Sequence, residues 1–181
     1  MLQFYKPNKS VKGSAASFSL NSKKGSVFVQ IIKQTGYDEA KRLGSFKDGK
    51  QVSIQLNQIE IGAIIDVLEH QTEFKTVHKT EKFTTGINFT PYIKDGKQLG
   101  YGLSVNRSEG ENKDSWLIGF NFHEAVVVRE WLKFALEHIF TADYSADKKK
   151  AEEYLKKNEG KQEQKREEPT PKQEPEDEII L

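Results

Sequence analysis

The stretches Leu56-Asn57-Gln58-Ile59-Glu60 and Phe120-Asn121-Phe122-His123-Glu124 each have the pattern of a helix start. Asn at the N-cap can accept a hydrogen bond from a free backbone N–H, and Glu three residues later can bond back to the Asn N–H. Apolar residues follow each start at helical spacing, and strand-like segments precede it. Asn57 and Asn121 lie 64 positions apart, so the sequence predicts a repeated unit of several antiparallel strands followed by one helix.

Working outward from the first helix start, β-branched and alternating segments predict four strands before a helix over about 58–70. The expected strands cover residues 14–20, 25–34, 42–46 and 51–56. The turn sequence Lys47-Asp48-Gly49-Lys50 favours a hairpin between the last two of them. The first half is therefore expected to form several antiparallel strands followed by a helix.

The second half repeats this organisation around the second helix start. Strands are expected over residues 73–80, 85–93, 99–107 and 115–120, followed by a helix over about 122–140. Lys94-Asp95-Gly96-Lys97 is a second Asp-Gly turn, between the second and third of these strands. The predicted fold class is α+β, in which a unit of several antiparallel strands followed by a helix occurs twice.

The 181 residues are enough for one ordinary domain and a tail, and they include no cysteine. We expect an N-terminal arm over residues 1–10, a globular domain over 11–140 and a disordered charged tail over 141–181, in which Glu–Lys pairs over 146–158 favour some helix. No signal, transit or membrane segment is recognised, so a cytoplasmic location without membrane contact is expected. The acidic and aliphatic tip of the tail is expected to dock on a partner protein through Asp177, Glu178, Ile179, Ile180 and Leu181.

Charge is distributed unevenly, although the net charge is only +1. Residues 1–50 carry ten basic and three acidic side chains, whereas 51–140 and 141–181 each carry nine basic and twelve acidic ones. A basic front half predicts a site for a polyanion, and the alternative is that the charges serve solubility alone.

Sequence signals for catalysis are absent. The chain has no Walker loop, no Gly-x-Ser-x-Gly and no Gly-x-Gly-x-x-Gly after a strand. The four histidines show no metal-binding spacing: His70, His78, His123 and His138. We therefore expect neither enzymatic activity nor a metal or cofactor.

Signals for binding are stronger, because the outward strand faces are polar, lysines lie at the strand ends and turns, and aromatics are interspersed among them. Phosphates need cations and unpaired bases stack on aromatic rings, so this pattern fits single-stranded nucleic acid. Tyr37 and Tyr92 are the preferred stacking candidates, whereas Phe18, Phe28 and Trp116 alternate inward and are assigned to the core. The predicted nucleic-acid-binding residues are Lys12, Lys23, Lys24, Lys33, Tyr37, Lys41, Arg42, Phe46, Lys47, Tyr92, Lys94 and Lys97.

The order of these segments resembles the Whirly family of single-stranded-DNA-binding proteins. Lys12-Gly13-Ser14-Ala15-Ala16-Ser17-Phe18-Ser19 is similar to the family motif Lys-Gly-Lys-Ala-Ala-Leu-Ser, with Ser14 and Ser17 as departures. Lys41-Arg42-Leu43-Gly44-Ser45-Phe46, Gly100-Tyr101-Gly102-Leu103-Ser104-Val105 and Trp131-Leu132-Lys133-Phe134-Ala135-Leu136-Glu137-His138-Ile139 resemble later segments of the family. The resemblance covers about residues 11–140 and extends more distantly to PC4-like coactivators and kinetoplastid guide-RNA-binding proteins.

The resemblance implies two four-stranded antiparallel β-sheets that are each followed by a helix. It also implies a homotetramer packed through its helices, with single-stranded DNA held on the sheet surfaces largely without sequence preference. The tip of the tail resembles those by which bacterial and phage single-strand-binding proteins recruit replication partners. The expected function is therefore single-stranded-DNA binding in replication, recombination or repair, in a bacterium or phage. The alternatives are an RNA-binding or annealing protein, a PC4-like transcriptional regulator, or a protein-interaction scaffold.

Overall fold

The computed structural model describes residues 1–166, with side chains over residues 1–155. It divides into one compact unit, Met1–Ala142, and a second unit that begins at Asp143. Helix α2 (Phe122–Arg166) belongs to the first unit through Ala142 and to the second from there on, and each unit is described by itself. No helix over residues 1–166 is long and apolar enough to cross a membrane.

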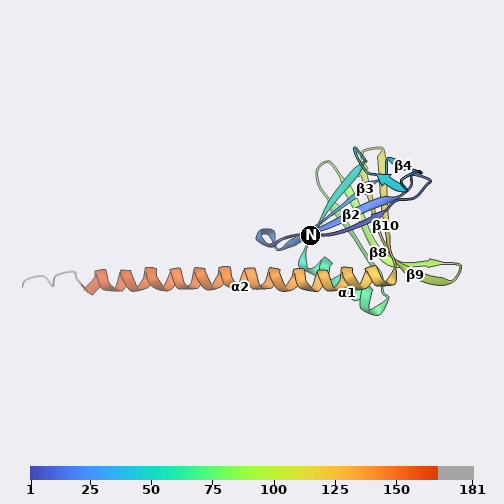
Figure 1. The fold of residues 1–181 in the computed structure, drawn as a ribbon. Helices are drawn as coiled ribbons and strands as arrows, with labels where there is room; N and C mark the ends of the chain where they lie inside the picture. Colours follow the sequence, from blue (N-terminus) through green and yellow to red (C-terminus); the bar gives the residue numbers. More distant parts are fainter. Residues whose placement is uncertain (167–181) are drawn as a thin grey trace, which may run out of the picture. The chain divides into compact units, whose positions relative to one another are not determined.

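The first sheet of the compact unit has four antiparallel strands in the order β1-β2-β3-β6 (Figure 1). A short 3-10 helix, Ser22–Lys24, makes the turn between its two central strands. In chain order the strands are β1 (Leu2–Lys6), β2 (Ser14–Asn21), β3 (Ser26–Lys33) and β6 (Gln51–Leu56). Alternation of small apolar and β-branched residues with Ser and Gln places one face inward and one outward.

Two sequence expectations for this sheet are corrected. Residues 1–10 were expected to be an arm, but Leu2–Lys6 pairs with β2 as an edge strand, because Phe4 is buried against the rings of Phe18 and Phe120. The segment 42–46 was expected to pair across a hairpin with β6. Instead β5 (Leu43–Ser45) pairs with β4 (Gly36–Asp38) in a separate two-stranded sheet, and β6 pairs with β3.

The second sheet is an antiparallel meander in the order β10-β9-β8-β7. Its hairpin turn at Asp95 and Gly96 is confirmed, with φ angles of 51° and 72° that suit the tight turns of Asp-Gly hairpins. Gly110 also has a positive φ, at the next turn. The strands are β7 (Phe74–Lys79), β8 (Thr84–Lys94), β9 (Lys97–Glu109) and β10 (Asn112–Phe120).

Both helix starts have the predicted capping box. At α1 (Gln58–His70), the Glu60 N–H donates to Asn57 Oδ1 and the Asn57 N–H donates to Glu60 Oε2, both at 3.0 Å. At α2 the same two bonds join Asn121 and Glu124 at 2.9 Å. Satisfying the first free N–H groups in this way fixes where each helix begins.

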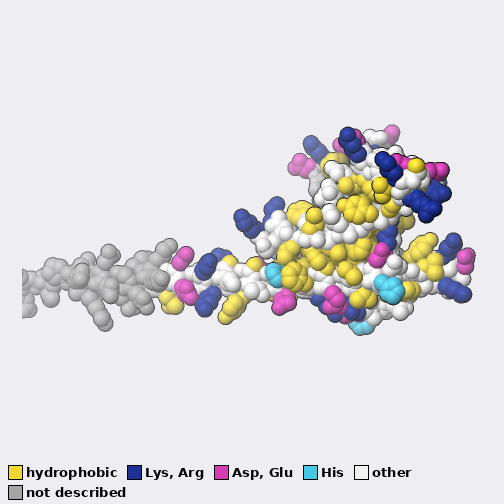
Figure 2. All heavy atoms as spheres, in the orientation of Figure 1, with side chains coloured by type: hydrophobic (Ala, Val, Ile, Leu, Met, Phe, Trp, Pro, Cys, Tyr) yellow, Lys and Arg dark blue, Asp and Glu magenta, His cyan; other side chains and the backbone are white. Residues whose placement is uncertain are grey.

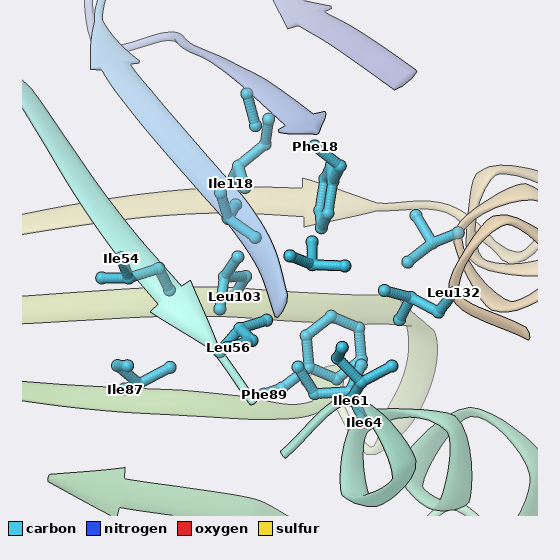
Figure 3. Packing of buried hydrophobic residues seen from close by; sticks show 14 of the residues in the cluster. Phe18, Ile54, Leu56, Ile61, Ile64, Ile87, Phe89, Leu103, Ile118 and Leu132 are labelled. Atoms are coloured by element: carbon cyan, nitrogen blue, oxygen red, sulfur yellow. The ribbon is translucent and has the colours of Figure 1, made fainter. Parts of the chain in front are cut away.

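A single hydrophobic core lies between the inner faces of the two sheets and the two helices (Figure 3). Ile54 and Leu56 from the first sheet meet Ile87 and Leu103 from the second, and Leu132 of α2 closes one end. All five side chains are buried. This core fixes how the two sheets cross, and therefore how their outer faces and ends are placed.

The core assignments of Phe18 and Trp116 are confirmed, since both side chains are buried. The assignment of Phe28 is wrong. Its register partners are Ser19 and Gln55, so the ring lies half-buried on the outer face of the first sheet. The inward side of β3 is instead filled by the β-branched residues next to it in the alternation.

Helix α2 replaces the expected disordered tail as far as Arg166. From Asp143 onward this segment is rich in Lys and Glu, and pairs such as Lys150–Asp147 at 3.7 Å stabilise a solvent-exposed helix. The expected docking tip, residues 177–181, lies outside the described part of the chain.

Candidate nucleic-acid interface

The outer face of the first sheet, which we call the first-sheet face, carries polar side chains with a few apolar ones between them. Strand register sets these side chains in rows across the sheet. The rows are Tyr5, Ala15, Ile32 and Gln51; then Gln3, Ser17, Gln30 and Ser53; then Ser19, Phe28 and Gln55. Side chains of this kind offer hydrogen bonds and flat contact area together.

An aromatic corner lies at one end of the first-sheet face. The ring centroids of Tyr5 and Phe46 are 6.0 Å apart in an edge-to-face arrangement, and the Tyr5 side chain is 61% exposed. Together with Ile32 and Gln30 these rings line a hollow of about 230 Å³. Phe46 is half-buried, so the exposed Tyr5 ring beside this shallow hollow offers the main surface on which an unpaired base can stack.

A basic notch lies where β10 crosses the ends of β3 and β6, and we call it the intersheet notch. The Trp116 indole N–H donates to the Lys50 carbonyl oxygen at 3.0 Å, and Lys33 Nζ lies 5.0 Å above the same indole ring. The Asp114 carboxylate lies between the two ammonium groups, 2.5 Å from Lys50 Nζ and 3.8 Å from Lys33 Nζ. The Ser14 hydroxyl donates to the Leu117 carbonyl oxygen at 2.7 Å and ties the same edge together.

Cavities open on both sides of the notch. The larger cavity, of about 500 Å³, is lined by several residues that include Lys50, Arg107, Lys113 and Asp114. The smaller cavity, of about 330 Å³, is lined by Lys12, Lys33 and other residues of the β1–β2 loop and its surroundings. The larger cavity is lined mainly by polar groups, Glu109 among them, whereas the smaller one combines Lys12 and Lys33 with apolar groups such as Val11 and Leu117. The lysines and Arg107 supply the cations that a phosphate backbone requires.

Arg107 is held rigidly in the larger cavity. Its Nη2–H donates to the Ser53 carbonyl oxygen at 2.9 Å and its Nε–H donates to the Thr85 hydroxyl at 3.1 Å. The guanidinium lies 5.2 Å from the ring centroid of Phe83. A guanidinium that is already oriented loses little side-chain entropy when an anion binds.

Gln34 organises the basic loops around the notch. This buried side chain accepts hydrogen bonds from the Asn8 and Gly13 N–H groups and donates to the Asn8 and Gly36 carbonyl oxygens. It thereby joins the β1–β2 loop to the segment between β3 and β4. A Cβ on Gly13 would lie 2.2 Å from the Lys6 carbonyl oxygen, so only glycine fits this close approach.

Seven of the predicted site residues come together at this end of the first sheet. Lys12 and Lys33 border the notch, and Phe46 forms the aromatic corner. The remaining four lie on or beside the small β4–β5 sheet, which Gln34 and Thr35 fasten to the end of β3: Tyr37, Lys41, Arg42 and Lys47. Figure 2 shows Lys and Arg side chains interspersed with Asp and Glu at the top of that view, with hydrophobic surface beneath them.

The other five predicted residues lie elsewhere. Lys23 and Lys24 are in the 3-10 helix at the opposite end of β2 and β3, where Gly25 approaches Gln58 and Ile139 near the helices. The end of the β8–β9 hairpin carries the last three, at the far end of the second sheet from the notch: Tyr92, Lys94 and Lys97. The predicted set therefore does not form one surface.

Sequence reasoning missed Tyr5, Ile32, Lys50 and Arg107. The alternation of Leu2 and Phe4 with Gln3 and Tyr5 was a usable strand signal that would have placed Tyr5 outward. Lys50 and Arg107 had no such signal, because their meeting depends on how the two sheets cross. No cluster of three or more His, Asp or Glu side chains suited to a metal lies within the described residues.

Comparison with known proteins gives likeness in structure only. No family model matches the sequence, and no curated protein matches it. Among solved structures, WHY1 from Arabidopsis thaliana superposes with a TM-score of 0.59 at 15% identity, covering 83% of this chain and 90% of that one. MRP1/MRP2 from Trypanosoma bruciei superposes with a TM-score of 0.57 at 17% identity, covering 76% and 83%.

A guide-RNA-binding protein complex solved with its guide RNA is similar to the same degree, with a TM-score of 0.57 at 16% identity over 76% of this chain and 89% of that one. The two sheets and two capped helices of residues 1–142 thus have the arrangement seen in these proteins. The chain has the Whirly fold.

Proposed function

We propose that this protein binds single-stranded nucleic acid, with single-stranded DNA as its main ligand, and that it acts as a binding protein rather than an enzyme. The observation that carries the proposal is the first-sheet face, where exposed aromatic and amide side chains adjoin a concentration of lysines. Stacking on Tyr5 and Phe46 and neutralisation of phosphates by the lysines act on any base sequence, so little sequence preference is expected.

The decisive experiment is a titration of labelled poly-dT, duplex DNA and RNA by fluorescence anisotropy at two or more salt concentrations. Binding to poly-dT should weaken with salt, with a slope of log K against log[salt] of about −0.7 for each phosphate neutralised. Equal affinity for duplex, or affinity independent of salt, contradicts the proposal.

A matched pair of variants locates the surface. Lys12→Gln with Lys47→Gln removes two cations from the notch end of the first sheet, whereas Lys23→Gln with Lys24→Gln removes two from its opposite end. Both pairs change the net charge equally, so a larger loss from the first pair shows that position matters. Equal losses would indicate attraction by net charge alone.

We also propose that the protein is a homo-oligomer, most simply a tetramer, assembled through its helices. Val127 and Phe134 are each 49% exposed on α2, and Ile59 is 84% exposed on α1. Large apolar side chains in such positions favour a covered surface. Sedimentation should show an oligomer that Phe134→Glu dissociates, and a monomer at micromolar concentration contradicts this part of the proposal.

RNA is the second candidate ligand, and one observation favours it: a structurally similar protein complex was solved bound to guide RNA. Recognition of RNA would require contacts to the 2′-hydroxyl group. Tighter binding to oligo-U than to oligo-dU of equal length would identify RNA as the ligand. Equal or weaker binding would leave DNA.

For the biological role we propose replication, recombination or repair, with partner proteins recruited by residues 177–181. The support is the sequence alone, in which three large aliphatic residues follow acidic ones at the end of a charged tail. Such a tip can insert into an apolar pocket with a basic rim. In an oligomer, several tips bind at once and raise the overall affinity for the partner. Deleting residues 174–181 should leave thermal stability unchanged and abolish capture of purified replication or recombination proteins. Undiminished capture contradicts the role of the tip.

A further inference from the structure

Asp114 lies between two lysines in the intersheet notch. Its two carboxylate oxygens face different lysines, with Oδ2 at 2.5 Å from Lys50 Nζ and Oδ1 at 3.8 Å from Lys33 Nζ. One carboxylate of the second sheet therefore bridges two ammonium groups, one at the end of β3 and one just before β6. Lys33 is additionally held over the ring of Trp116, so its ammonium group is already oriented toward the notch.

The bridge is accessible rather than sealed in the core. The side chain of Asp114 is 28% exposed, and those of Lys33 and Lys50 are 41% and 62% exposed. Ion pairs this open contribute little net stability, because water solvates the separated charges well. Replacing the carboxylate by another anion would therefore cost the fold little.

The surroundings suit an anion larger than a carboxylate. Asp114 lines the larger cavity together with Arg107, Lys113 and one further acidic residue, Glu109, and Lys33 lines the smaller cavity together with Lys12. Cations therefore outnumber carboxylates around the notch. Arg107 is oriented by its own hydrogen bonds and leaves part of its guanidinium toward the larger cavity. A phosphodiester could be bound here by several cations at once.

We propose that the intersheet notch is a phosphate subsite in which Asp114 pairs with Lys33 and Lys50 in the free protein and is replaced by a phosphate group on binding. The proposal rests on the proposed binding of single-stranded nucleic acid and deepens it, since it places one backbone phosphate between the first-sheet face and the second sheet. Asp114 then acts as an internal competitor that lowers affinity for polyanions.

The first test compares Asp114→Asn with Asp95→Asn in poly-dT titrations. Both changes remove one negative charge, but Asp95 lies in the exposed turn at the far end of the β8–β9 hairpin. Asp114→Asn should tighten binding at low salt by about three- to tenfold, because the phosphate no longer competes with the carboxylate for Lys33 and Lys50. Asp95→Asn should change the affinity much less, and adding Lys50→Gln to Asp114→Asn should cancel the gain.

The second test uses the free anion and a local probe. The indole N–H of Trp116 is bonded inside the notch, whereas Trp131 lies half-buried on α2 against Phe18, so the two indole resonances in a ¹H–¹⁵N spectrum give a probe and an internal reference. Inorganic phosphate, pyrophosphate and a dT oligonucleotide should each shift the Trp116 resonance, and at lower concentration in Asp114→Asn. An unchanged Trp131 resonance in that variant shows that the fold is intact.

The outcomes separate the two proposals. If the protein binds poly-dT but Asp114→Asn behaves as Asp95→Asn does, the phosphate subsite is wrong while the proposed function stands. If phosphate and pyrophosphate shift Trp116 but no single strand binds, the notch is an anion site for a free phosphate compound and the proposed function is wrong. A Trp116 resonance that no phosphate compound shifts overturns the subsite directly.

Discussion

Truncation of Tyr5 should weaken binding of single strands without destabilising the fold. Tyr5 is 61% exposed and its ring lies beside Phe46, so Tyr5→Ala removes little buried surface from the folded protein. Base–aromatic stacking contributes about 1–3 kcal/mol per base, which corresponds to about a 5- to 150-fold loss of affinity for one lost stack. Tyr5→Phe keeps the ring and should bind nearly as the unchanged protein does.

The matched control is Tyr92→Ala, which removes another exposed tyrosine, 49% exposed, from the far end of the second sheet. Anisotropy titration with dT oligonucleotides gives the affinities, and urea unfolding checks that both variants remain folded. We expect a large loss for Tyr5→Ala and almost none for Tyr92→Ala. The reverse order would refute the assignment of the first-sheet face and restore the hairpin end, which the sequence favoured, as the stacking site.

Three further predictions concern the fold. Gly100→Ala should lower the free energy of unfolding by at least about 2 kcal/mol in urea titrations, because φ is +149° and a Cβ would lie 2.0 Å from the Phe120 carbonyl oxygen. Asn121→Ala should cost about 1 kcal/mol in the same assay through loss of the α2 capping box, and no measurable cost would contradict the role of the cap. A hydrogen bond from Lys133 holds the pKa of Glu69 below its ordinary value, so the Glu69 carboxylate stabilises the fold above about pH 4.3 and loses this effect as the pH falls through the lowered pKa. The difference in stability between the unchanged protein and Glu69→Gln should therefore disappear in acid. A difference that persists in acid would refute this prediction.

Local signals in the sequence determined most of the secondary structure. Both capping boxes depend on residues three positions apart, and the Asp95-Gly96 turn joins strands that are adjacent in the chain. Such contacts form within a few residues, so residue type and spacing suffice to predict them. The same is true of the strand alternation that placed Phe18 and Trp116 in the core.

Pairing between distant strands was decided by the tertiary structure. Two Asp-Gly turn sequences looked alike, yet only the second makes a simple hairpin, because β3 and not β5 offers β6 an inward row of β-branched residues to pack beside. The pairing of β3 with β2 and β6 also decides which face Phe28 lies on. Its register partners, Ser19 and Gln55, are on the outer face, so Phe28 is on the outer face too. A shift of register by one residue reverses every side chain, and local sequence does not fix it.

The candidate site shows the same division. The sequence identified the lysines and aromatics of the basic front half as binding residues. Seven of the twelve predicted residues do gather at one end of the first sheet. The intersheet notch joins Lys33 and Lys50 to Asp114, which lies far along the chain in the second sheet. That meeting exists only because burial of two apolar faces against each other sets the angle at which the sheets cross, and the angle depends on the whole core rather than on any segment of the sequence.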